Sequence, residues 1–155
     1  MKDAISEDYT NIISTIITCK GKIIFFGVGK IGNVALKSAS TFSSLGIPSF
    51  FLSPSEANHG GLGVICPEDV AILLSKNGET SELISIIPYL KELKVPLIAI
   101  TENKQSVLYK EADYVQCLPN IKEACIFDLA PTSSTTMTMC YLDSLAVAIS
   151  RKKNF

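Results

Sequence analysis

The sequence predicts an α/β fold in which helices cover both faces of a five-stranded parallel sheet, a three-layer αβα sandwich. Short apolar runs alternate along the chain with segments of helical periodicity, and the connections between them are short. The runs are apolar throughout, as expected for strands that are buried on both faces. With 155 residues, 47% of them hydrophobic, the chain is expected to form a single domain over residues 1–155.

Five short apolar runs are predicted to be the strands of this sheet. They cover residues 22–26, 48–52, 70–74, 96–101 and 114–117. Strand–helix alternation with short connections gives a parallel, doubly wound order. Such sheets bind ligands at the carboxyl ends of their strands, so the segments that follow the strands are the expected place for a site.

Helices are predicted over residues 5–18, 32–44, 81–93, 107–111 and 133–150. In the first of them, the four isoleucines at positions 12, 13, 16 and 17 share one face, which is the spacing of an amphipathic helix. The segment 53–67 is rich in glycine, proline and serine and is expected to be irregular.

Composition excludes several classes of function. A net charge of −1 with 19% charged residues provides no basic surface for nucleic acid. No apolar run reaches the roughly 18 residues that a membrane span needs, and no secretory segment is expected. The five cysteines form no CxxC pair or Cys/His cluster, so we expect free thiols, no metal site and a cytoplasmic protein.

A glycine turn follows the first predicted strand and satisfies G-x-G-x-x-G from Gly27 to Gly32. Glycine permits a tight turn and a close approach of backbone to ligand. A dinucleotide site also needs an acidic residue at the end of the second strand, and no carboxylate occurs there before Glu56. Three interpretations remain: a nucleotide site, a turn that only packs helix on strand, and a sugar-phosphate site at Gly29 in which Lys30 supplies positive charge.

Two polar loops precede predicted helices, one over residues 75–82 and one over residues 131–136. Free backbone N–H groups at a helix start, at the positive end of the helix dipole, bind phosphate or another small anion. Two such junctions in one small domain predict a phosphorylated small molecule as the ligand.

Three further residues are candidates for the chemistry of the site. His59 is the single histidine of the chain and lies in a glycine-flanked loop, where a structural role and a site role are both open. Glu82 lies one turn into the helix after the first polar loop, and Glu123 lies in the loop after the fifth strand. Carboxylates at such positions are usually solvated; two that converge with a lysine form a proton-transfer set.

The chain resembles the sugar isomerase (SIS) domain of the arabinose-5-phosphate isomerase family, a flavodoxin-like fold. The resemblance runs from about residue 21 to residue 155. Lys-Glu-Ala-Cys at 122–125 and Leu-Ala-Pro-Thr-Ser-Ser-Thr-Thr at 129–136 point to this subgroup. The other matching segments are 27–30, 41–42, 46–51, 54–60, 78–82, 95–101 and 143–148.

The resemblance implies an isomerase that interconverts ribulose 5-phosphate and arabinose 5-phosphate through an enediol(ate), without an organic cofactor, for Kdo synthesis in lipopolysaccharide or capsule assembly. It implies a catalytic set and a substrate-binding set, and assembly into a homo-oligomer such as a dimer or tetramer. The catalytic set is Lys30, Glu82 and Glu123. The substrate-binding set is Gly29, His59, Ser75, Asn77, Thr80, Ser133, Ser134 and Thr135.

The chain also departs from the family pattern. Ile31 stands where the family usually has serine, Lys76-Asn77 replaces Asn-Ser, and Gly61 replaces an aspartate. Longer family members continue into a His-Pro-Gly-Gly segment with a catalytic histidine and often into a pair of CBS domains, neither of which is expected within residues 1–155. These departures keep two alternatives open: a catalytically weak sugar-phosphate or nucleotide-sugar sensor, and a purely structural oligomerisation module.

Overall fold

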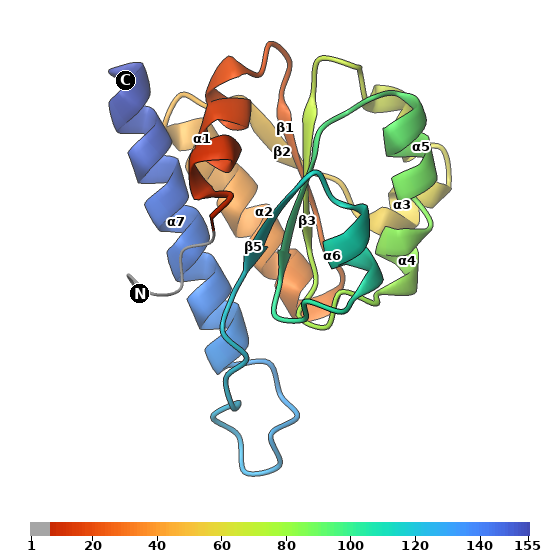
Figure 1. Cartoon of the computed structure of the whole chain (residues 1–155), viewed down its shortest axis with the longest axis vertical. Helices are drawn as coiled ribbons and strands as arrows, with labels where there is room; N and C mark the ends of the chain where they lie inside the picture. The colour runs from red at the N-terminus through yellow and green to blue at the C-terminus, as the bar shows by residue number, and fades with distance from the viewer. Residues whose placement is uncertain (1–6) are drawn as a thin grey trace.

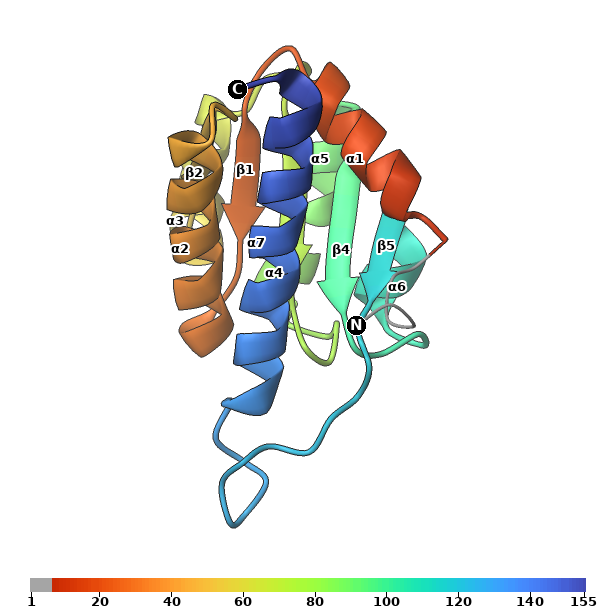
Figure 2. The same ribbon diagram turned by 90° about the vertical axis from the view of Figure 1, so that its left-hand side faces the viewer.

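The computed structural model describes residues 7–155, and its centre is a five-stranded sheet in the order β2-β1-β3-β4-β5. Every neighbouring pair of strands is parallel. Helices α1, α2 and α7 cover one face, and the helices from α3 to α6 cover the other (Figures 1 and 2). The predicted three-layer parallel sandwich is therefore confirmed. No helix among the described residues has both the length and the apolar character needed to cross a bilayer.

The strands lie close to their predicted positions, and two of them match the prediction in full. They are β1 (Ile23–Phe26), β2 (Ser49–Phe51), β3 (Val70–Leu74), β4 (Leu97–Thr101) and β5 (Tyr114–Cys117). The helices are α1 (Tyr9–Thr18), α2 (Gly29–Ser44), α3 (Pro54–Asn58), α4 (Ser81–Ile84), α5 (Ile87–Glu92), α6 (Val107–Glu111) and α7 (Ser133–Lys153), with a 3-10 helix η2 (Gly61–Val64).

The single helix predicted over residues 81–93 is wrong, because the structure divides it into α4 and α5. Pro88 lies in the first turn of α5. Proline has no backbone N–H, and its ring would clash with the carbonyl group four residues earlier, which belongs to Ile84, the last residue of α4. The first polar loop is therefore followed by a helix of only one turn.

Four other predictions of local structure also need correction. The segment 53–67 is not irregular throughout, since α3 begins at Pro54, a residue well suited to a first helical position. Helix α2 begins at Gly29, three residues before the predicted start, and α7 extends to Lys153. Helix α1 begins at Tyr9; positions 5 and 6 of the predicted leading helix lie outside the described residues.

The sheet separates two hydrophobic cores. In β1, the side chains of Ile23 and Phe25 pack with α1, α2 and α7, whereas those of Ile24 and Phe26 pack with the helices on the opposite face. All four are essentially inaccessible to solvent. The ring of Phe25 meets that of Phe42 of α2 edge to face, with centroids 5.0 Å apart. This two-sided burial explains why the strands are apolar at successive positions.

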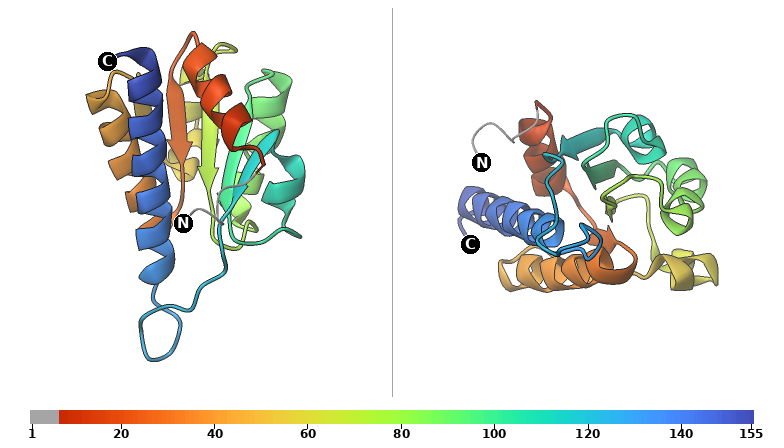
Figure 3. Two further views of the ribbon diagram at one scale, coloured as in Figure 1. Left: turned by 60° about the vertical axis from the view of Figure 1, so that its left-hand side comes forward. Right: turned by 90° about the horizontal axis from the view of Figure 1, so that it is seen from below.

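The carboxyl ends of the strands share one edge of the sheet, from which the long loop over residues 118–132 projects beyond the body of the domain (Figures 1 and 3). The loop connects β5 to α7 and carries Glu123 near its base. Its outer part exposes three large apolar side chains, Ile126, Phe127 and Leu129.

Candidate functional site

Two hollows lie side by side at the carboxyl edge of the sheet, where the chain leaves the neighbouring strands β1 and β3. At this point of the sheet the order of the strands reverses along the chain, and doubly wound proteins bind ligands there. Both hollows are lined by Val28 and Lys30. We call the first, of about 660 Å³, the glycine-turn hollow, and the second, of about 260 Å³, the serine-loop hollow.

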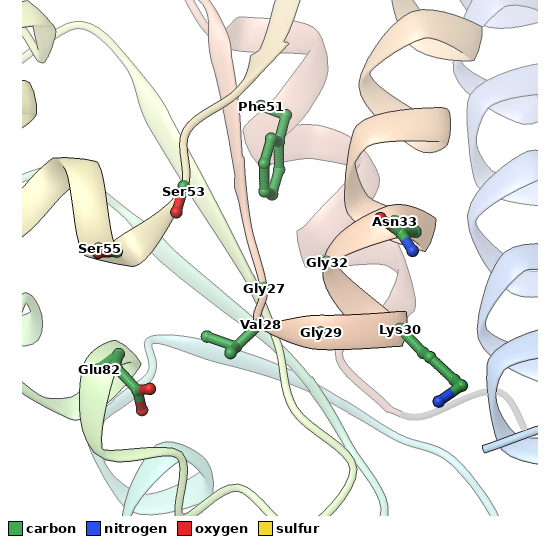
Figure 4. Close-up of a pocket in the computed structure, with 10 residues that line it drawn as sticks. All are labelled: Gly27, Val28, Gly29, Lys30, Gly32, Asn33, Phe51, Ser53, Ser55 and Glu82. Carbon is green, nitrogen blue, oxygen red and sulfur yellow. The ribbon is translucent and has the colours of Figure 1, made fainter. Parts of the chain in front are cut away.

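The glycine-turn hollow combines the turn after β1 with segments around β2, α3 and α4 (Figure 4). It is lined by Gly27, Val28, Gly29, Lys30, Gly32, Asn33, Phe51, Ser53, Ser55 and Glu82. In Figure 4, Glu82 and Lys30 lie on opposite sides of Val28, and the lysine side chain points away from the carboxylate. One cation, one anion and several hydroxyl and amide groups thus surround a space large enough for a sugar.

The glycines of this turn are needed for close approach and for an unusual backbone conformation. A Cβ atom on Gly32 would lie 2.8 Å from the carbonyl oxygen of Gly27, so the first turn of α2 packs directly on the end of β1. Gly29 has a φ of +65°, in the left-handed region that favours glycine. The packing interpretation of the G-x-G-x-x-G motif therefore holds alongside any ligand role.

The serine-loop hollow lies between the loop after β3 and the first turns of α7. Most of its lining residues have polar or charged side chains, and they include two lysines and one carboxylate. The residues are Val28, Lys30, Ile31, Ser75, Lys76, Asn77, Thr80, Glu102, Pro131, Ser134, Thr135 and Thr138. The structure therefore brings both predicted polar loops to a single cavity. Ser133 does not line it.

The loop after β3, over residues 75–80, is called the serine loop and is held in shape by hydrogen bonds among its own polar groups. The hydroxyl groups of Ser75 and Thr80 are 2.8 Å apart, and the Ser75 hydroxyl donates to Oδ1 of Asn77 at 3.0 Å. The backbone N–H of Gly78 donates to Ser75 Oγ, and that of Glu79 donates to Asn77 Oδ1, both at 3.0 Å. These two N–H groups are not free for an anion, whereas the prediction that the start of α4 binds one stays a prediction.

The start of α7 binds an anion that belongs to the chain itself. The carboxylate of Glu123 accepts hydrogen bonds from the backbone N–H groups of Thr132 at 2.8 Å and Ser134 at 3.2 Å. It also accepts from the hydroxyl groups of both residues. The second predicted phosphate site is therefore occupied by a side-chain carboxylate, which satisfies the helix start electrostatically.

Glu123 is almost fully buried, and Lys76 supplies its counter-charge. The ammonium group lies 2.5 Å from Oε1 of Glu123. Burial by itself would raise the pKa of this carboxyl group; the Lys76 ammonium, the Ser134 hydroxyl and the two amides outweigh it and hold the pKa far below the usual range. The same contact raises the pKa of Lys76. Glu123 therefore stays ionised at neutral pH, and the Lys76 charge is already compensated.

The predicted catalytic set does not meet in one hollow. Glu82 lines the glycine-turn hollow, where its own backbone N–H and the Ser81 hydroxyl lower its pKa. Glu123 lies behind the serine-loop hollow, which it reaches through its partners Lys76 and Ser134. Lys30 lines both hollows, and no described residue forms an ion pair or hydrogen bond with its ammonium group.

His59 lies outside both hollows. Its side chain is exposed, and ring Nδ1 is 2.7 Å from the carbonyl oxygen of Ser55. The sugar-binding role that the resemblance implies for His59 stays a prediction.

Sequence reasoning missed one carboxylate of the site, Glu102. This residue directly follows β4 and lines the serine-loop hollow. Its Oε2 atom is buried and has no hydrogen-bond partner among the described residues. The available signal was its position as the first residue after a buried strand, the same signal that identifies Ser75 after β3.

The described residues contain no cluster of three or more histidine, cysteine or acidic side chains that could hold a metal ion. The five cysteines are free thiols. At the end of β2, the glycine-turn hollow is lined by Ser53 and Ser55, where a dinucleotide fold would need a carboxylate. The polar groups of both hollows are suited to a small polar ligand.

A model of the SIS domain family matches residues 16–148, and the chain therefore belongs to the SIS domain family. It is 47% identical over 151 residues to arabinose 5-phosphate isomerase KdsD of Shigella flexneri, and 46% identical over 150 residues to arabinose 5-phosphate isomerase KpsF of Escherichia coli. These alignments cover 97% of the chain, but only 46% and 47% of those proteins. The chain thus spans about half the length of these relatives.

The fold is also similar to solved structures. The E. coli CFT073 protein c3406, whose structure is a complex with arabinose 5-phosphate, superimposes with a TM-score of 0.93 at 40% identity, covering 96% of this chain and 79% of that one. A more distant neighbour, the C-terminal domain of glucosamine-fructose-6-phosphate aminotransferase from Francisella tularensis, has a TM-score of 0.82 at 19% identity. It covers 99% of this chain and 42% of that one, and at this identity it supports the fold alone.

Proposed function

We propose that the chain is an aldose–ketose isomerase that interconverts ribulose 5-phosphate and arabinose 5-phosphate through an enediol(ate). The observation that carries the proposal is the similarity to c3406, a structure in complex with arabinose 5-phosphate, together with 46–47% identity to isomerases named for the same sugar phosphate. In a cell, its product would feed Kdo synthesis for lipopolysaccharide or capsule in the cytoplasm.

The reaction moves a proton between C1 and C2 of the sugar and needs a base, a carrier of protons between the oxygens and a positive group near the developing enediolate. Lys30 meets the last need, because its ammonium group is uncompensated and lines both hollows. Glu82 is the carboxylate of the glycine-turn hollow and is proposed as the proton-transferring group. Both carboxylate oxygens of Glu123 already accept hydrogen bonds from other groups of the chain. This favours a positioning role for Glu123 over the proton transfer that the resemblance implies.

We place the phosphate group in the serine-loop hollow and the sugar carbons in the glycine-turn hollow, with Lys30 between them. The smaller volume of the serine-loop hollow, and the two lysines and several hydroxyl side chains among its lining residues, support this orientation. Gly29 would approach the sugar with its backbone, and His59 would contact it from the rim. The hydroxyl and amide donors proposed for the phosphate are those of Ser75, Asn77, Thr80, Ser134 and Thr135, and no longer that of Ser133, which lies outside this hollow.

A homo-oligomer is part of this proposal. Ile126, Phe127 and Leu129 are each at least 79% exposed on the projecting loop, and such a group of apolar side chains marks a contact surface. Sedimentation velocity of the wild-type chain and of Phe127→Asp would test it. We expect a larger species that dissociates in the variant, and a wild-type monomer at micromolar concentration would contradict it.

The alternative function is that of a weakly catalytic sugar-phosphate or nucleotide-sugar sensor. It is favoured by the separation of Glu82, which lines the glycine-turn hollow, from Glu123, which lies behind the serine-loop hollow. NMR of the purified chain with ribulose 5-phosphate in D2O separates the two functions. If the chain is an isomerase, deuterium enters the sugar. If it is a sensor, the bound sugar phosphate raises the melting temperature of the chain but no deuterium enters the sugar.

The matched variants for this experiment are Glu82→Gln and Glu92→Gln. Glu82 lines the hollow, and Glu92 is an exposed residue at the end of α5. We expect Glu82→Gln to reduce exchange by about 100-fold or more, the usual contribution of a general acid–base group, while Glu92→Gln keeps the wild-type rate. Equal rates in both variants would remove Glu82 from the mechanism.

A further inference from the structure

Two carboxylates from different strand ends approach the same lysine at the serine-loop hollow. Glu123 pairs directly with Lys76, at 2.5 Å. Glu102 interacts with Lys76 over a longer distance, and the backbone N–H of Ile121 lowers the pKa of its carboxyl group. The two glutamates also repel each other electrostatically. One ammonium group thus faces two carboxylates, so the immediate charge balance is negative when both are ionised.

The donors are divided very unequally between these two carboxylates. Glu123 accepts from Lys76, Thr132 and Ser134, and both of its oxygens are hydrogen-bonded. Glu102 has a buried oxygen, Oε2, without a partner in the described part of the chain. An ionised carboxylate with a buried, unsatisfied oxygen is costly, and a proton on that group removes most of the cost. A proton that enters this cluster therefore goes to Glu102.

The remaining charged groups near Glu102 do not alter this conclusion. Lys104, two residues along the chain, interacts with the Cys117 thiol at the end of β5, as does Glu102 itself. Lys30 lines the same hollow from α2 and is not among the charges that shift the pKa of Glu102. Burial is the largest influence on Glu102 and raises its pKa, Lys76 and the Ile121 amide lower it, and Glu123 raises it further. The net direction is upward.

A phosphate dianion in the serine-loop hollow would add two negative charges beside this cluster. Like charges that share a site favour the protonated form of the weaker acid, which here is Glu102. We propose that Glu102 is the proton-accepting carboxylate of the serine-loop hollow, and that a phosphomonoester binds there together with one proton on Glu102. Glu102 would then determine which ionic form of the ligand the site accepts. This inference rests on the phosphate position in the proposed function.

Inorganic sulfate is the probe that isolates this effect, because it stays a dianion over the whole range from pH 5 to pH 9, whereas phosphate titrates near pH 6. Binding is measured by calorimetry for the wild type, Glu102→Gln and the control Glu92→Gln, and the amide NMR signals of residues 75–80 locate the bound ion. Repeating the titration in buffers of different ionisation enthalpy counts the protons taken up with each sulfate.

We expect the affinity of the wild type for sulfate to fall as pH rises. Above the pKa of Glu102 in the free protein, the decrease should approach tenfold per pH unit, and close to one proton should be taken up with each sulfate. Glu92→Gln should behave like the wild type. Glu102→Gln should bind sulfate with little pH dependence and more tightly than the wild type at pH 8. Equal pH slopes in the wild type and Glu102→Gln, loss of binding in Glu102→Gln, or no sulfate binding at millimolar concentration would each overturn the inference.

Isomerisation is assayed separately on the same samples. Turnover without Glu102-dependent proton uptake would reject this inference and leave the proposed function standing. Proton-linked sulfate binding without isomerisation would reject the proposed function and leave the role of Glu102 standing.

Discussion

The ammonium nitrogen of Lys76 lies 2.5 Å from Oε1 of Glu123, although 47 residues separate the two in the sequence. The lysine side chain is 39% exposed and the glutamate side chain 2% exposed, so the pair connects the surface of the serine loop to a buried carboxylate. That carboxylate also holds the start of α7. The ion pair therefore fixes the two walls of the serine-loop hollow relative to each other.

Glu123→Gln should destabilise the fold at neutral pH. The amide keeps the shape but loses the charge, and its NH2 group would face donors at the start of α7. We expect the free energy of unfolding to fall by about 2–3 kcal/mol, the order of a charged hydrogen-bond network left incomplete. Urea unfolding at pH 7 measures it, with the exposed Glu92→Gln as the control, for which a change within about 0.5 kcal/mol is expected.

The stability that Glu123→Gln loses relative to the wild type should become smaller as pH falls. Because the pKa of Glu123 is lower in the folded state than in the unfolded state, its ionised form stabilises the fold above the ordinary value of 4.5. This stabilisation is lost progressively as pH falls below that value. The wild type and Glu123→Gln should therefore converge in stability as pH decreases from 5 toward 2, and a constant difference over this range would contradict the assignment.

Gly78→Ala should disrupt the serine loop. Gly78 has a φ of +68°, and a Cβ atom there would lie 2.1 Å from Oγ of Ser106 and 2.4 Å from its Cβ. The left-handed conformation alone costs about 1 kcal/mol in a residue with a side chain, and the clash adds to it. We expect a loss of at least about 2 kcal/mol in stability and weaker sulfate binding. Gly63→Ala is the matched control, because a Cβ atom on Gly63 meets nothing within 4 Å.

Asp69→Asn should weaken the fold at the opposite edge of the sheet and spare the site. Asp69 is buried and accepts from the backbone N–H and the ammonium group of Lys22, at 2.9 and 2.8 Å, and from the N–H of Cys66 at 2.8 Å. Burial opposes its ionisation, but these donors prevail and lower its pKa. We expect a loss of about 2 kcal/mol at pH 7 that shrinks as pH falls below 3.8. Sulfate affinity per folded molecule should not change.

The sheet could be predicted from sequence because burial on both faces leaves a strong local signal, as in Val70–Leu74 and Tyr114–Cys117, where prediction and structure coincide. The division of the helix near Pro88 could have been predicted from proline chemistry. The short helix α3 is less visible, because five residues in a segment rich in glycine and serine give no periodic pattern.

The edge of the sheet at which the site lies and the loops that form it could be predicted from sequence, but the side chains that pair with one another there could not. Both polar loops do line one hollow, as the parallel topology requires. The ion pair of Lys76 with Glu123 joins loops from β3 and β5, and sequence spacing contains no information about such a contact. As a result, the start of α7 was assigned to a phosphate group, whereas a carboxylate of the chain is bound there.

The two lysines of the serine-loop hollow should respond in opposite ways to loss of their charge. Lys30 is exposed, and no described residue forms an ion pair with it, so Lys30→Gln should change stability by less than about 0.5 kcal/mol. Its ammonium group is nevertheless the uncompensated cation between the two hollows. The variant should therefore weaken sulfate binding and reduce deuterium exchange into ribulose 5-phosphate by about 100-fold, if one preorganised electrostatic contact is lost.

Lys76→Gln should instead reduce the stability of the fold, because it leaves the buried Glu123 carboxylate without its counter-charge. We expect a loss of about 2–3 kcal/mol in stability at pH 7, less than for a fully buried pair because Lys76 is partly exposed. This loss of stability should become smaller below pH 4.5, where Glu123 can take up a proton. Thermal unfolding and calorimetry on both variants give the comparison. A stable Lys76→Gln that loses sulfate binding would show instead that Lys76, and not Lys30, is the cation that binds the ligand.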